Sequence, residues 1–219
     1  MALDAGVLKQ RHRQVRDRQE PSLALRLHRA LSWLGRAERE NGDADARFLF
    51  LWIAFNAVYA SEFGFESREL QQMRTFIQRW LALDHERQLH TLLHRQYCGP
   101  VRTLIENRYV FEPFWRALRE HDPSDAWKQQ FERMRERSLR ALLDGDTATC
   151  LLLVLERLYV LRNQLVHGGA TWNSQVNRQQ LADANRLLGA IVPVLLSLMM
   201  QEDTPDFGEV AYPPVLQPA

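Results

Sequence analysis

The segment VLRNQLVHGG, residues 160–169, brings together side chains suited to acid–base chemistry on a phosphate. Arg162 carries a permanent charge and a planar fork of N–H donors that matches phosphate oxygens. His167 supplies an imidazole, the side-chain group best suited to move protons at physiological pH. Asn163 shares a helix face with His167, whereas Arg162 lies ~140° away from it on a regular helix. These residues form a candidate catalytic site.

The same residues also have a purely structural interpretation. The leucine-rich segment 147–167 reads as one helix, and Gly168 and Gly169 are suited to end it in a left-handed cap. Cationic side chains near a helix C-terminus interact favourably with the helix dipole, at ~0.3–1 kcal/mol each. Spacing alone favours the helix cap, because such helix ends are common.

The elements that position this segment are expected to be helices throughout. Apolar residues recur at helical spacing, and the alternation typical of strands is rare. We predict an all-α up-and-down helical bundle with additional peripheral helices. The expected helices cover about residues 22–39, 44–63, 67–82, 84–97, 125–143, 147–167 and 174–201, with short helical pieces in 101–121. Cys98–Pro100 is expected to stop a helix, and Pro193 to kink one.

The chain divides into three predicted parts. Residues 1–20 read as a polar N-terminal arm, either loose or marginally helical. Residues 21–202 form the single all-α domain, and residues 203–219 form a Pro-rich C-terminal tail.

Composition points to an ordinary cytoplasmic globular protein. Apolar residues make up 46% and charged residues 25% of the chain, with a net charge of +1. Any contact with RNA must therefore come from a local patch of basic residues. The most apolar stretches, 48–60 and 187–200, are shorter than the ~20 residues that cross a bilayer, so we expect buried helices and no membrane association. The two cysteines suggest no disulfide framework.

A second constellation consists of metal-ligand residue types at four-residue spacing: Glu86, His90, His94 and Cys98. A helix rises 1.5 Å per residue, which separates the first and last of them by ~18 Å. A single tetrahedral ion would reach only two neighbours and need further ligands. We therefore expect a solvated stripe, with no metal and no cofactor.

Two segments carry a resemblance to a known family. RNQLVH resembles the Arg-x4–6-His signature of the HEPN superfamily, with Asn163 as the polar residue after the arginine. The helix FLFLWIAFNAVY (48–59) is similar to the Apea-like HEPN subgroup in the spacing of Trp52, Phe55, Asn56 and Tyr59. Glycines follow His167 where some branches of the superfamily carry a tyrosine, so the chain departs from those branches.

The resemblance implies a metal-independent endoribonuclease that acts as a homodimer, with two motifs meeting across the two-fold axis. His167 would be the general acid or base, and Arg162 would stabilise the phosphate in the transition state. Asn163 would orient the histidine or hold the scissile phosphate, with Asn56 supporting the motif from the second helix. The products would be 2′,3′-cyclic phosphate and 5′-hydroxyl ends. If the protein acts in defence or in an RNA stress response, a protein antitoxin or regulator would be a further partner.

Two other functions stay open at this point. A HEPN fold without catalysis would bind RNA, a nucleotide or a protein partner through the same groove. An all-α interaction protein would use the Arg/His end only as a helix cap. The role of residues 84–143, as lid, specificity insert or core, is likewise open.

Overall fold

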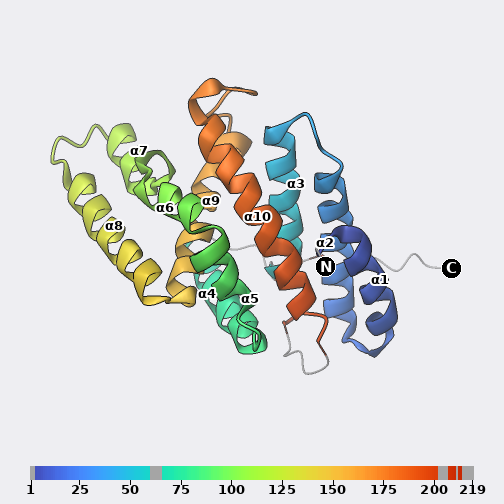
Figure 1. Cartoon of the computed structure of the whole chain (residues 1–219). Coiled ribbons are helices and arrows are strands. Elements are labelled where there is room, and N and C mark those ends of the chain that lie inside the picture. Colours follow the sequence, from blue (N-terminus) through green and yellow to red (C-terminus); the bar gives the residue numbers. More distant parts are fainter. Residues whose placement is uncertain (1–2, 60–65, 202–206, 211, 214–219) are drawn as a thin grey trace.

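The computed structural model describes residues 3–59, 66–201, 207–210 and 212–213, and every regular element in these ranges is helical (Figure 1). The all-α prediction is confirmed. The α-helices are α1 (Ala5–Val15), α2 (Pro21–Glu38), α3 (Ala44–Tyr59), α4 (Glu66–Leu83), α5 (Gln88–Thr91), α6 (Cys98–Glu106), α7 (Glu112–Arg119), α8 (Ala126–Asp144), α9 (Thr147–Val166) and α10 (Arg178–Leu198). Shorter turns are η1 (Arg16–Arg18), the π-helical η2 (Leu92–Gln96), η3 (Arg108–Val110) and η4 (Gln175–Asn177).

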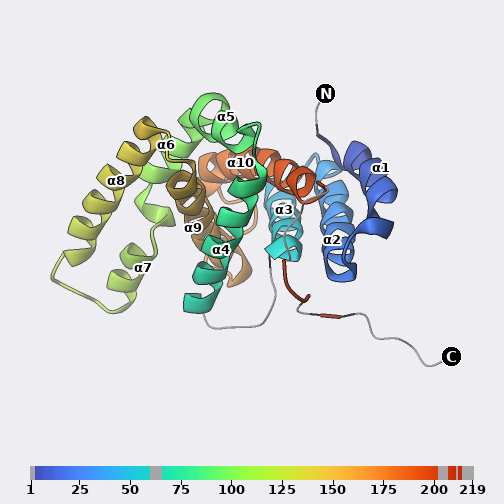
Figure 2. The ribbon, with the colours of Figure 1, turned by 90° about the horizontal axis from the view of Figure 1, so that it is seen from below.

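α9 is surrounded by several other helices of the bundle. Figures 1 and 2 show α1 and α2 at one end, α3 and α10 in the middle, and α6, α7 and α8 at the other end. α9 contacts α3 on one side and α4, α6 and α8 on others. The candidate catalytic segment is therefore carried by a helix that most of the bundle holds in place.

Aromatic side chains join α3 to its neighbours. α3 is apolar on nearly all sides, as expected for a central helix. The rings of Phe55 and Trp80 lie 6.1 Å apart between α3 and α4, and those of Trp52 and Tyr159 lie 6.0 Å apart between α3 and α9. Such aromatic pairs contribute beyond the area they bury. The first pair joins α3 to α4, and the second joins α3 to the middle of α9.

The N-terminal segment differs from a loose polar arm. Ala5, Leu8 and His12 recur at helical spacing on α1 and are buried against the body of the protein. The guanidinium of Arg11 donates to the hydroxyl of Ser197 on α10 at 2.8 Å. These three buried residues form a narrow stripe, which is difficult to recognise in a sequence of mostly polar residues. The stripe is enough to pack the short helix α1 against α2 and α10.

Boundaries differ from expectation in two places. Residues 84–97 form a turn, α5 and η2 rather than one helix, and Cys98–Pro100 then begin α6. Proline is tolerated there because first-turn N–H groups lack intrahelical partners. α10 continues past Pro193 to Leu198, as the helix predicted over 174–201 does. Residues 60–63 of the expected second helix lie outside the described residues, as does most of the predicted tail, although Phe207 is described and buried against Phe76.

One described helix, Gln175–Leu198, is long and apolar enough to span a membrane. Within the fold, 78% of its most apolar 18-residue window is buried. Packing between α3, α2 and α6 therefore accounts for its apolar character.

Candidate functional site

The site begins with α9, whose two ends are closed by its own sequence. The carboxylate of Asp146 accepts from the backbone N–H of Thr149 at 3.0 Å and caps the first turn. At the other end the N–H of Gly168 reaches the carbonyl of Leu165 at 3.3 Å, and the N–H of Gly169 reaches that of Gln164 at 2.7 Å. This pair of bonds is a Schellman cap, and the expected glycine ending is confirmed. Residues 162–169 are called the α9 tip below.

Gly168 is required by its backbone conformation, and this leads to a first prediction. Its φ of 69° lies in the left-handed region. We expect Gly168→Ala to lower the free energy of unfolding by about 1 kcal/mol, measured by urea denaturation. Gly42→Ala is the matched control, because neither residue has a neighbour within 4 Å of its added Cβ and Gly42 has no positive φ. Equal stability of the two variants would contradict the assigned cap.

Arg162 and Asn163 are brought together at the α9 tip. Nη1 of Arg162 donates to Oδ1 of Asn163 at 2.8 Å, and the guanidinium carbon lies 5.9 Å from the ring centre of Tyr159. Both residues are half-buried. Since Asn163 is on the helix face that His167 shares, this bond draws the guanidinium toward that face. The resemblance implied that Asn163 orients the histidine or holds the scissile phosphate, and its carbonyl oxygen here accepts a hydrogen bond from Arg162.

His167 is the C-cap residue of α9 and is exposed. Its backbone N–H is bonded to the carbonyl of Asn163 at 3.0 Å, so its backbone is held while its imidazole faces solvent. Three large apolar residues close to it in the chain are also exposed: Val166 (51%), Trp172 (74%) and Val176 (88%). Exposed apolar side chains of this kind are candidates for contact with a partner where they lie together on one surface.

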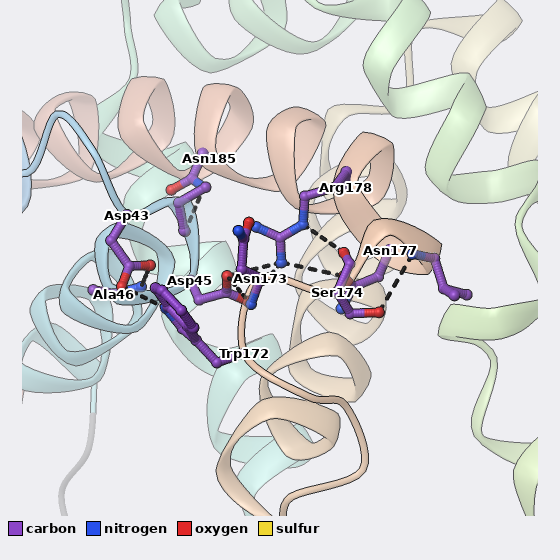
Figure 3. Close-up of polar contacts among 11 residues, drawn as sticks. Asp43, Asp45, Ala46, Trp172, Asn173, Ser174, Asn177, Arg178 and Asn185 are labelled. Atoms are coloured by element: carbon purple, nitrogen blue, oxygen red, sulfur yellow. Dashed lines mark hydrogen bonds and ion pairs between the residues drawn. The ribbon is translucent and has the colours of Figure 1, made fainter.

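The segment that follows the α9 tip is anchored to the first turn of α3, as Figure 3 shows. Nη2 of Arg178 lies 2.8 Å from the carboxylate of Asp45, which is 6% exposed. The backbone N–H of Asn173 also approaches that carboxylate, at 3.3 Å. Nε of Arg178 donates to the carbonyl of Ser174 at 2.7 Å. Sequence reasoning did not single out Asp45 or Arg178, since nothing local relates two residues so far apart in the chain.

A second anchor lies beside the first. The indole N–H of Trp172 donates to Oδ2 of Asp43 at 2.8 Å, while Oδ1 of Asp43 caps α3 by accepting from the N–H of Ala46 (Figure 3). The Ala46 N–H, and after it the Trp172 N–H, lower the pKa of Asp43 because both donate to its charged form. Trp172 is thus held by its polar edge while much of its ring stays exposed.

The middle segment of the chain supports the α9 tip from another side. The side-chain amide of Gln164 donates to the carbonyl of Tyr109 in η3 at 2.6 Å. The indole N–H of Trp115 in α7 donates to the same carbonyl at 2.8 Å. Residues 108–115 are therefore packed against α9 next to the candidate site.

Among the described residues, no hydrogen bond joins Asn56 to Arg162 or His167. Trp172 and Asn173, which follow the end of α9, contact Asp43 and Asp45 at the start of α3. The end of α9 therefore lies beside the start of α3, and the two helices run in opposite directions. Asn56 lies one turn beyond Trp52, whose ring contacts that of Tyr159 in α9. Its Oδ1 is buried without a hydrogen-bond partner among the described residues. Its supporting role stays a prediction that no hydrogen bond to Arg162 or His167 carries.

The histidines of the second constellation pack against the turn between α8 and α9. The rings of His90 and His94 lie 4.6 Å apart, and Nδ1 of His94 lies 3.1 Å from the carbonyl oxygen of Leu142. Burial, and then the charge of Arg87, lower the pKa of His90. In the described part of the chain, no three His, Cys, Asp or Glu side chains are grouped to hold a metal ion.

Comparisons of the chain with protein-family models, with curated proteins and with solved structures give no match. A functional conclusion must therefore be drawn from the α9 tip and its surroundings.

Proposed function

We propose that the protein is a metal-independent endoribonuclease of the HEPN type, with its active site formed by the α9 tips of two identical chains. The observation that carries the proposal is the pairing of a half-buried arginine, held by Asn163 at 2.8 Å, with an exposed histidine on the same helix end. A helix cap alone requires neither the carboxamide contact nor an exposed imidazole.

The proposed reaction uses the 2′-hydroxyl of the RNA as its nucleophile. A base removes the 2′-hydroxyl proton, and the oxygen attacks the adjacent phosphorus. An acid then protonates the departing 5′-oxygen, which leaves a 2′,3′-cyclic phosphate and a 5′-hydroxyl. One α9 tip contributes one histidine, His167. A two-fold axis through this surface supplies the second, so base and acid come from different subunits.

Arg162 is suited to the charge that develops on the phosphate. Its bond to Asn163 engages one N–H, and no other hydrogen bond or ion pair of its guanidinium occurs within the described ranges. The remaining N–H groups are available to phosphate oxygens. We assign Asn163 as the positioning residue that holds the guanidinium toward the face of His167.

The exposed apolar residues around the α9 tip are the proposed dimer contact. Val166, Trp172 and Val176 lie within ten residues of His167 and are more than half exposed. The anchoring of Trp172 to Asp43 reduces the freedom that its ring would lose on binding. A contact centred here would place two copies of His167 near one another.

Disruption of this contact is the second prediction. We expect Val176→Glu to weaken dimerisation at least tenfold without changing monomer stability, because it places a charge in an apolar contact. Sedimentation equilibrium measures the dissociation constant, and thermal unfolding checks the fold. Leu143→Glu is the matched control, since Leu143 is 87% exposed and lies on α8. Equal effects of the two substitutions on the dissociation constant would place the dimer contact elsewhere.

The function itself is tested by incubating the purified protein with a labelled RNA in EDTA and identifying the ends of the products. The proposal predicts cleavage with 2′,3′-cyclic phosphate and 5′-hydroxyl ends, and no cleavage of a substrate with 2′-deoxyribose at the scissile position. Intact RNA, or products that end in 3′-hydroxyl groups, would overturn it. Binding of RNA without cleavage would indicate instead a catalytically inactive binding module.

A further inference from the structure

A cavity of about 290 Å³ lies beside α9, on the side that faces α7, η3 and α8. Figure 2 shows these helices next to one another at one end of the molecule. Most of the cavity wall is apolar, formed by Val110, Phe111, Pro113, Leu153, Tyr159 and Val160. Its size falls at the lower end of the range for small-molecule sites. The residues of the α9 tip do not line it.

Arg157 is the unusual member of the cavity wall. It is 4% exposed, and its Nη1 donates to the carbonyl of Val110 at 3.1 Å. Its guanidinium carbon lies 4.7 Å from the ring centre of Phe111 and 5.8 Å from that of Phe131. Its Nη2 is buried and has no hydrogen-bond partner among the described residues. A buried guanidinium normally has an anionic partner, because desolvation of an uncompensated charge is unfavourable.

Neither carboxylate at the cavity is hydrogen-bonded to Arg157, although the charge of Glu156 favours its cationic form. Glu156 is directed to Arg74, with 3.9 Å between carboxylate and guanidinium, and Glu112 pairs with Arg119 at 2.7 Å. Burial lowers the pKa of Arg157 to about 10, so the side chain is still a cation at neutral pH. Arg116 adds a second cation at the exposed edge of the cavity. Two arginines and two glutamates therefore interrupt a mostly apolar wall, and each glutamate has another arginine as its ion-pair partner.

We propose that this cavity binds a small organic monoanion, a carboxylate on an apolar body of about eight carbons, with the carboxylate paired to the guanidinium of Arg157. The apolar body lies against the walls formed by η3, α7 and α9. Arg116 at the edge assists entry of the anion by charge attraction. This site is separate from the RNA-cleaving site proposed above and does not depend on it.

Calorimetric titration of the full chain with octanoate and with 1-octanol tests the proposal on the wild-type protein. Both probes have the same number of carbons, and octanol is the more apolar, so the hydrophobic effect alone favours octanol. We expect octanoate to bind with one-to-one stoichiometry and a dissociation constant at least tenfold lower than that of octanol. Equal affinities, tighter binding of octanol, or no octanoate binding at millimolar concentration would overturn the proposal.

The variant Arg157→Met tests whether octanoate binds in this cavity. Methionine keeps an apolar side chain of similar length, and replacement of a buried charge in this way often leaves a fold intact. We expect this variant to bind octanoate at least tenfold more weakly than wild type. The matched control is Arg39→Gln, which removes an exposed arginine at the end of α2, away from the residues that line the cavity, and should leave octanoate binding unchanged. Full octanoate affinity in Arg157→Met, or its loss in Arg39→Gln, would place the anion elsewhere.

Discussion

His167→Ala is expected to lower the rate of RNA cleavage by about 10²–10⁴-fold, the usual contribution of a general acid or base. In the proposed dimer the substitution removes both proton-transfer groups at once, so the larger end of that range applies. His167 is exposed and contributes its backbone, rather than its ring, to the cap of α9. The variant should therefore keep the stability of the wild-type protein, measured by thermal unfolding.

His85→Ala is the control for this substitution. His85 is also exposed, and it lies in the turn after α4, away from the α9 tip. We expect it to cleave RNA at the wild-type rate. If His167→Ala and His85→Ala cleave equally well, His167 is not the proton-transfer group and the assignment fails.

Arg178→Ala is expected to lower the free energy of unfolding by about 3 kcal/mol, because it leaves a buried carboxylate without its cation. Asp45 is 6% exposed, and its other described contact is a weaker backbone donor, the N–H of Asn173 at 3.3 Å. The estimate lies at the lower end of the range for buried pairs because 23% of the Arg178 side chain is exposed. Urea denaturation measures the change.

Lys128→Ala is the comparison for Arg178→Ala. The pair between Lys128 and Asp125 has a similar distance of 2.8 Å but both side chains are more than half exposed. Exposed pairs contribute about 0–1 kcal/mol, so this substitution should have little effect. A similar loss of stability in the two variants would show that the Asp45–Arg178 contact does not anchor the segment after α9.

The features predicted from sequence are those that depend on local pattern. Helical spacing is a short-range signal, and it located α2, α8 and α9 within a few residues. The ending of α9 was predictable because glycine adopts positive φ with little cost, and Gly168 does so. The contact between Arg162 and Asn163 joins neighbours in the chain, yet the sequence did not indicate it, because rotamers depend on the surrounding packing.

The features that sequence reasoning missed depend on contacts between distant parts of the chain. The pairing of Asp45 with Arg178 joins the start of α3 to the start of α10, and no periodicity connects them. Arg157 reads as an ordinary polar residue in a leucine-rich helix, and only the packing of Phe111 and Phe131 around it shows that it is buried. The resemblance assigned Asn56 a supporting role, and its buried Oδ1 has no hydrogen-bond partner among the described residues, so that role stays a prediction.

Subunit mixing tests the shared active site most directly. Wild-type chains are mixed with increasing amounts of His167→Ala chains, the dimers are allowed to exchange, and RNA cleavage is measured in EDTA. If each site needs a histidine from both subunits, only wild-type homodimers cleave, and equal amounts of the two chains give about a quarter of the dimers in that form. The account predicts this square dependence on the wild-type fraction. A linear decrease, with half of the activity left at equal amounts, would contradict a site shared between two α9 tips.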